Sequence, residues 1–168
     1  MEGTHGPMSA FHQKNWTQRV TQMGDQAENA CDLVHHGKTH TLGLNRIWQN
    51  GDGLYLNDMT DAMRYTPDRL SRWCFIECMG IGRDNTLKIK QEKLEALNKW
   101  SKLGPTELFV YSSAKNVWWQ DATHTWQDAA QTHGELLTFP EGKHYWALHT
   151  DHFPTDPQTV PDNEDVFA

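Results

Sequence analysis

The run of ten residues from Arg72 to Ile81, RWCFIECMGI, constrains the fold most strongly. Its side chains are largely apolar at both odd and even positions, whereas a strand with one face in water alternates apolar and polar side chains. The run therefore predicts the central strand of a sheet covered on both faces, ending at Gly80 and Gly82. Glu77 lies inside it, where a carboxylate is costly unless it is paired, protonated or bound to a metal.

Helical periodicity flanks this strand on both sides. From Trp16 to Val34, apolar residues recur at spacings of three and four, which is typical of a helix with one buried stripe. A second amphipathic pattern runs from Leu87 to Trp100, after the capping residues 84–86. The helix that it predicts ends at Gly104-Pro105.

Four further segments have the character of strands, and they complete a mixed α/β fold. They are residues 38–46, 62–70, 107–112 and 116–120. The expected order is helix, three strands, helix, strand, with residues 116–120 as an additional edge element.

The chain of 168 residues is within the size of one domain. We expect residues 1–120 to form its core, with about the first ten residues flexible, and residues 121–168 to form a C-terminal extension. Within that extension we expect a helix near residues 125–135, then a mostly irregular tail rich in proline and acidic residues.

Charge and hydropathy limit the classes of function. The net charge of −7 argues against a simple nucleic-acid coat, but residues 151–168 hold five acidic residues and no Lys or Arg, so a basic groove elsewhere stays possible. No window approaches 18 uninterrupted apolar residues, and the N-terminus lacks the apolar stretch of a secretory signal. We therefore expect a soluble, cytoplasmic protein without membrane contact. Its three cysteines form no CxxC pair and are expected to be reduced.

Two carboxylates around the central strand carry the predicted chemistry. Asp68 follows Pro67 near a hairpin, and Glu77 lies on the strand after it, so the two side chains can meet across adjacent strands. Mg²⁺ binds through one or two carboxylates while keeping several waters, and a metal-bound water is the nucleophile for phosphodiester hydrolysis. The segment thus indicates a hydrolytic centre.

This order of elements and these residues resemble the PD-(D/E)xK superfamily of restriction-endonuclease-like nucleases over roughly residues 11–120. The resemblance implies a helix-meander-helix-strand (αβββαβ) core, with a mixed central sheet flanked by helices. Asp68 and Glu77 match the two acidic positions of the motif and would be catalytic residues and ligands of Mg²⁺ or Mn²⁺. Glu28 on the first helix and the backbone carbonyl of Cys78 would complete the metal shell.

The sequence departs from that family in the tripeptide Glu77-Cys78-Met79, where a thioether replaces the catalytic lysine. Lys90 is the candidate to replace it, because on the predicted helix it shares a face with Leu94 and Leu97. Alternatively, the site binds metal or DNA without cutting.

The expected function is therefore that of a small Mg²⁺-dependent deoxyribonuclease in recombination, repair, replication or phage-host conflict. The alternative is an inactive protein of the same fold that binds DNA or a partner enzyme. Lys88, Gln91 and Arg69 are the expected DNA contacts; Gln91 corresponds to a polar residue, often Gln, early in the family's second helix. A homodimer is plausible because cutting two strands often uses two sites.

Two other groups of residues have competing interpretations. Cys31, His35, His36 and His40, with Cys74 or Cys78, can in principle bind Zn²⁺ in an interaction module, although their spacing matches no standard zinc pattern. Cys31 also fits the buried stripe of the first helix. A second group, of aromatic residues, can stack on unpaired bases or pack in the core; it consists of Tyr111, Trp118 and Trp119.

Overall fold

The computed structural model describes residues 16–42 and 65–163. No helix within these ranges is both long and apolar enough to span a membrane. In chain order the elements are α1 (Trp16–Val34), β1 (His40–Thr41), β2 (Arg69–Leu70), β3 (Phe75–Ile81), β4 (Thr86–Lys90), α4 (Gln91–Trp100), β5 (Thr106–Ser112), β6 (Val117–Ala122), α5 (Thr123–His133), β7 (Glu135–Thr138), β8 (His144–His149), the 3-10 helix η1 (Thr150–His152) and β9 (Gln158–Thr159).

The larger of two sheets has six strands in the order β1-β2-β3-β5-β6-β9. Strand β3 lies inside it, antiparallel to β2 and parallel to β5 over the whole range from Phe75 opposite Thr106 to Ile81 opposite Ser112. The chain crosses from β3 to β5 through β4 and α4. The predictions of a mixed α/β fold and of an internal β3 strand are confirmed.

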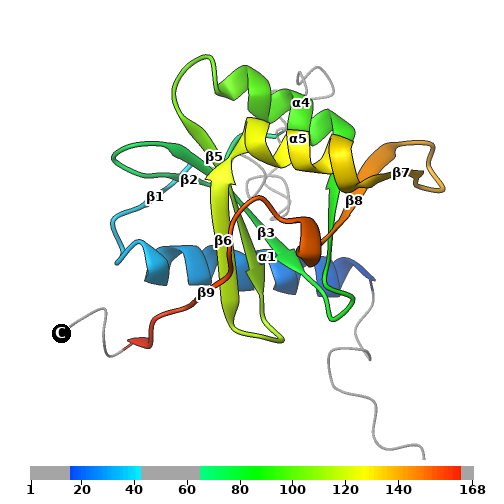
Figure 1. Ribbon diagram of the computed structural model, residues 1–168. Helices are drawn as coiled ribbons and strands as arrows, with labels where there is room; N and C mark the ends of the chain where they lie inside the picture. The colour runs from blue at the N-terminus through cyan, green and yellow to red at the C-terminus, as the bar shows by residue number, and fades with distance from the viewer. Residues whose placement is uncertain (1–15, 43–64, 164–168) are drawn as a thin grey trace, which may run out of the picture.

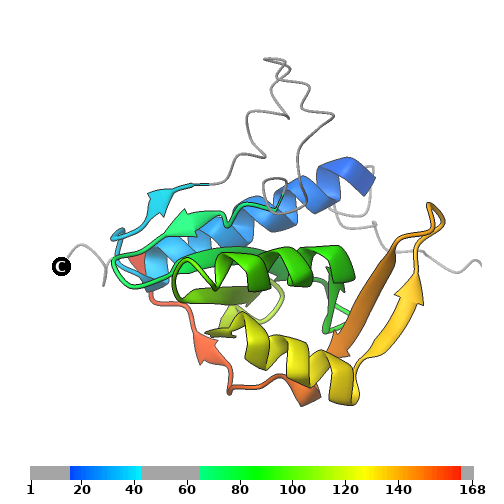
Figure 2. The ribbon, with the colours of Figure 1, turned by 90° about the horizontal axis from the view of Figure 1, so that it is seen from above.

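Helices cover the larger sheet on both faces, with α1 on one side and α4 and α5 on the other (Figures 1 and 2). Toward α1, Ile76 and Cys78 of β3 pack in a cluster with Ala27 and Cys31. The approach is close at Gly80, where an added Cβ would lie 2.8 Å from a backbone oxygen of α1. Alternate positions of β3 face the opposite layer, and this explains why both faces of the strand are apolar.

The opposite layer is closed by the smaller sheet, whose strand order is β4-β8-β7. Its core includes Leu87 of β4, Leu94 of α4, Val110 of β5, Trp126 of α5 and Leu148 of β8. Residues after position 120 therefore share a hydrophobic core with residues before it.

Two sequence predictions are wrong in this region. The segment after α5 is not mostly irregular, because β7, β8, η1 and β9 lie there. The second helix begins at Gln91 rather than near Leu87, because residues 86–90 pair as β4 with β8, from Thr86 opposite His149 to Lys90 opposite Tyr145. Helix α5 agrees with the helix expected near residues 125–135.

Residues 43–46 and 62–64 of the first two predicted strands, and the first ten residues predicted to be flexible, lie outside the described residues. Within the described ranges, β1 and β2 are the parts of those strands that pair with the sheet, His40 opposite Leu70 and Thr41 opposite Arg69.

Candidate functional site

The carboxylates of Asp68 and Glu77 lie at neighbouring positions of β2 and β3. Asp68 immediately precedes β2, and its Oδ2 accepts a hydrogen bond of 2.9 Å from the backbone N–H of Cys78, the residue after Glu77. The antiparallel register, with Arg69 opposite Ile76, fixes this arrangement. The structure thus brings together the two acidic side chains that the sequence singles out.

A lysine completes the cluster, and it is Lys93 rather than Lys90. The Lys93 Nζ donates a hydrogen bond to Oε1 of Glu77 and forms an ion pair with it; the side chains of Lys93 and Glu77 are 19% and 3% exposed. Lys93 belongs to the first turn of α4 and is followed by Ala96 and Leu97, both buried, at i+3 and i+4.

Lys90 is the last residue of β4, so the helical face that the sequence assigned to it does not exist. Its Nζ lies 5.9 Å from the centre of the Phe139 ring. The prediction that Lys90 supplies the cation of the site therefore gives way to Lys93.

Burial and mutual repulsion govern the titration of the cluster. Burial, and then the negative charge of Asp68, raise the pKa of Glu77 to about 8 against the attraction of Lys93. Burial likewise raises the pKa of Asp68, although Lys93 and the Cys78 N–H oppose it. Burial alone would lower the pKa of Lys93, but the carboxylates of Glu77 and Asp68 outweigh it and raise that pKa. One ammonium thus binds Glu77 directly and acts on Asp68 through its charge.

One buried acceptor of the cluster is unused: within residues 16–42 and 65–163, no hydrogen-bond donor meets Oε2 of Glu77. A hard divalent cation fits this oxygen and the adjacent Asp68, because it supplies the positive charge that two carboxylates and one ammonium lack. Among residues 16–42 and 65–163 no group of three or more His, Cys, Asp or Glu side chains gathers as a metal site. Mg²⁺ needs only one or two carboxylates, with water and substrate phosphate as its other ligands.

Arg69, predicted to contact DNA, is instead buried, at 6% exposure, and tied into the fold. Its guanidinium forms ion pairs with Glu28 at 2.8 Å and with Asp32 at 2.9 Å, and it donates to the backbone carbonyl of Asp68 at 3.2 Å. Arg69 therefore fixes α1 against the strand that carries Asp68, and its cation is not presented to a phosphate backbone.

Glu28 is buried, at 8% exposure, and forms the ion pair with Arg69. Its charge contributes to the raised pKa values of Asp68 and Glu77, so it lies within electrostatic reach of the cluster. Glu28, a predicted metal ligand, thus lies near the site, but its carboxylate is already paired with Arg69.

Cys78 is buried, and its thiol hydrogen-bonds with that of Cys31 on the α1 side of the sheet. This contact and His35 lower the pKa of Cys31 to about 7, while Nε2 of His35 lies 2.8 Å from Oε1 of Gln120. Cys31 is therefore a buried core residue of α1, as the second of its two interpretations predicts. His36 and His40, which the zinc hypothesis also needs, are exposed.

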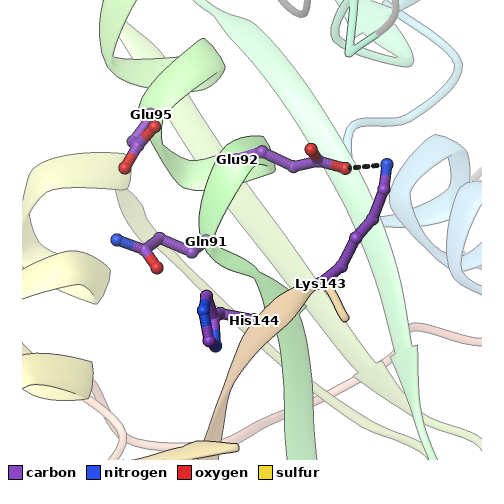
Figure 3. A pocket seen from close by; sticks show the side chains of 5 residues that line it. All are labelled: Gln91, Glu92, Glu95, Lys143 and His144. Carbon is purple, nitrogen blue, oxygen red and sulfur yellow. Dashed lines mark hydrogen bonds and ion pairs between the residues drawn. The ribbon is translucent and has the colours of Figure 1, made fainter. Parts of the chain in front are cut away.

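The first turn of α4 also borders an open pocket of about 280 Å³ (Figure 3). Gln91 lines it, together with Glu92, Glu95, Lys143 and His144. Lys143 donates to Oε1 of Glu92 at 2.7 Å, and the Tyr65 hydroxyl donates to the same oxygen. Because the Tyr65 ring lies 5.7 Å from Nζ of Lys93, these contacts connect the β7–β8 hairpin with the cluster.

Lys88, the other predicted DNA contact, is about half exposed on β4 and forms a 2.9 Å ion pair with Asp84. Lys88 is therefore accessible to a phosphate, but its ammonium is already paired with the Asp84 carboxylate.

Comparison with known proteins yields no match. No protein-family model, no curated protein and no solved structure matches this chain. The geometry of Asp68, Glu77 and Lys93 is therefore the basis of the function proposed below.

Sequence reasoning missed Lys93 because it began the helix too early. The letters Thr-Leu-Lys-Ile-Lys of residues 86–90 alternate polar and apolar side chains, and that alternation is the signal of a half-buried strand. Beginning the helix at Gln91 would have removed Lys90 from it and left Lys93, four residues before the buried Leu97, as the candidate in its first turn.

Proposed function

We propose that this protein is a metal-dependent nuclease that hydrolyses phosphodiester bonds of DNA, with Asp68, Glu77 and Lys93 as its catalytic residues. The observation that carries the proposal is the cluster itself: the buried Glu77 pairs with Lys93 beside Asp68, and its second oxygen has no hydrogen-bond partner among the described residues. An electrostatic deficit of this kind is costly in an ordinary core and useful where a cation and a phosphate must bind.

The arrangement of elements supports a PD-(D/E)xK type of core. Helix α1, the strands β1, β2 and β3, helix α4 and strand β5 follow in the order that the sequence resemblance implies, with β4 of the smaller sheet as an additional strand before α4 and with β5 parallel to β3. Met79, at the position of the usual lysine, packs against the hydrophobic cluster on the α4 side of the sheet. A lysine on α4 supplies the cation in its place.

The residues of the cluster divide the chemical work among them. Asp68 and Glu77 would hold Mg²⁺ or Mn²⁺, which when bound polarises the phosphate and activates water. The Cys78 N–H orients the Asp68 carboxylate. The Lys93 ammonium, kept protonated by its raised pKa, would offset the negative charge that develops on the phosphate oxygens.

The test is cleavage of labelled DNA by the parent protein and by Glu77→Ala, with Mg²⁺, with Mn²⁺ and with chelator. Linear duplex, single-stranded and branched substrates identify the preferred DNA structure. Cleavage should require metal and disappear in Glu77→Ala, while Glu135→Ala, which removes an exposed carboxylate from β7, should cut like the parent. Metal-independent cleavage, or full activity of Glu77→Ala, would refute the proposal.

The substitution at Met79 favours one second candidate, a protein of the same core that binds DNA or a partner without cutting. The diagnostic variant is Met79→Lys. New or strongly increased cleavage by this variant would favour the binding protein, because it would mean that the parent lacks only the motif lysine. If the parent already cuts and depends on Lys93, this candidate is eliminated.

A further inference from the structure

Exposed apolar side chains gather at one end of the larger sheet. Four large apolar side chains are exposed among the described residues, and Trp73 and Leu103 are by far the most exposed, at 74% and 75%. Trp73 lies in the β2–β3 turn and Leu103 in the segment after α4, while Leu70, at 36%, is the last residue of β2; the fourth, Leu136, lies on β7. An exposed tryptophan beside further apolar surface is typical of a binding site.

The two segments are adjacent. The backbone N–H of Phe75, which begins β3, donates to the carbonyl of Pro105 at 2.8 Å, and the Phe75 ring packs edge-on against Trp100 with centres 5.4 Å apart. Gly104 lies directly against the same ring. Figure 2 shows the β2–β3 turn and the end of α4 on the same side of the molecule.

The turn that carries Trp73 is well formed, so the exposure of the indole is built into the structure. The Ser71 hydroxyl accepts hydrogen bonds from the backbone N–H groups of Trp73, at 3.2 Å, and Cys74, at 3.0 Å. The Ser71 N–H in turn donates to the Cys74 carbonyl at 2.9 Å. The fold therefore presents the indole on a rigid turn.

Basic residues lie next to Trp73 and in the adjacent segment after α4, although the chain as a whole has a net charge of −7 and Glu107 lies 3.6 Å from the Cys74 thiol. The guanidinium of Arg72 lies 4.8 Å from the centre of the Trp73 ring. Lys99 and Lys102 are exposed at the end of α4, and neither residues 70–74 nor residues 99–105 include an acidic residue. An exposed indole with cations around it is complementary to a nucleic-acid strand, which offers flat bases and negative phosphates.

We propose that this surface binds unpaired nucleotides of the DNA substrate, with one base stacked on Trp73 and neighbouring phosphates held by basic side chains. The surface consists of Leu70, Arg72, Trp73, Lys99, Lys102 and Leu103. The inference rests on the proposed nuclease function for its choice of DNA. Trp73 precedes Glu77 by four residues, or at most roughly 13 Å along the chain, a distance that a few nucleotides of single-stranded DNA can span. The preferred substrates then carry a single-stranded segment next to the cut.

The tryptophans considered from the sequence alone do not take this role. Trp119 is buried, at 3% exposure, and Trp118 stacks on Phe109 with ring centres 5.5 Å apart. Their interpretation as packing residues is confirmed, which leaves Trp73 as the accessible indole at the sheet end described above.

The test measures binding of a fluorescein-labelled oligothymidylate and of a blunt duplex by anisotropy, in chelator so that no cleavage occurs. The variants are Trp73→Ala and Arg72→Ala. Their matched controls are Leu136→Ala, an exposed apolar residue on β7, and Arg83→Ala, an exposed arginine beyond the other end of β3. Since Trp73 is exposed, its removal leaves no cavity in the core.

We expect Trp73→Ala to raise the Kd for oligothymidylate about 5- to 150-fold, the range for loss of one base-stacking contact, and to change duplex binding far less. Arg72→Ala should reduce the slope of log K against log salt by about 0.7, as expected for one lost phosphate contact on a single strand. Both control variants should bind like the parent.

The proposal is overturned if the parent does not bind oligothymidylate, or if Trp73→Ala binds it as well as Leu136→Ala does. It is equally overturned if Trp73→Ala leaves DNA binding intact but changes the sedimentation mass, which would assign the surface to a protein contact. Failure of the nuclease function has a different signature: the parent binds oligothymidylate through Trp73 yet cuts no DNA when Mg²⁺ is added.

Discussion

Replacing Glu77 by glutamine should make the metal-free protein more stable at alkaline pH while abolishing its activity. Glutamine keeps the shape of the side chain and still offers an oxygen to Lys93, but it carries no charge. Burial and Asp68 hold the pKa of Glu77 at about 8 in the fold, above the ordinary 4.5. A carboxyl group with a raised pKa contributes stability that is fully present below pH 4.5 and is lost as the pH rises through 8.

The interval from 4.5 to about 8 corresponds to a ceiling of roughly 5 kcal/mol in the free energy of unfolding. Glutamine gives up the charge-assisted hydrogen bond from Lys93, which offsets part of this gain. The net expectation is that Glu77→Gln exceeds the parent by about 1–4 kcal/mol at about pH 9 and matches it within about 1 kcal/mol at about pH 5.

Urea unfolding in chelator at the two pH values measures the difference, with Glu135→Gln on β7 as the control for an exposed carboxylate. Added Mg²⁺ should stabilise the parent and leave Glu77→Gln unchanged, since the parent alone keeps both carboxylates. A parent protein that is as stable as Glu77→Gln at about pH 9 without metal would refute the reasoning, because the fold would then already compensate the charge of Glu77.

Three further predictions test the remaining contacts. Lys93→Met should reduce the cleavage rate by about 100- to 1,000-fold, as loss of a transition-state donor does, whereas Lys90→Met should largely preserve it; single-turnover assays compare the two. Arg69→Met should lower the free energy of unfolding by about 3–5 kcal/mol in urea titrations, because it leaves Glu28 buried without its cation. Gly80→Ala should cost about 1–3 kcal/mol in the same assay, because its Cβ would strike the backbone of α1.

Local patterns in the sequence predict those elements in which the order of apolar and polar side chains reveals which faces are buried. The apolar residues of β3 indicate burial on both faces, and the periodic stripe of α1 indicates a one-sided helix; both elements are present as expected. Asp68 and Glu77 were also predictable, because a hairpin between their positions brings neighbouring strands together.

What the sequence did not predict depends on pairing between distant segments. Strand β4 exists because β8, about sixty residues later, supplies its hydrogen-bond partners, and β8 shows little alternation of its own, with Tyr145, Trp146 and Ala147 all partly buried. The start of α4, and with it the identity of the lysine beside Glu77, follows from that distant pairing rather than from local helix propensity.

The pairing of β4 with β8 also sets an order of events during synthesis. The ribosome makes Asp68, Glu77 and Lys93 early, but β8 ends at His149, and until it emerges β4 has no partner in the smaller sheet. Lys143, which binds Glu92 beside Lys93, emerges equally late. A nascent chain therefore carries both carboxylates well before α4 has its final support. The cluster thus gains its full support only after the ribosome has passed His149.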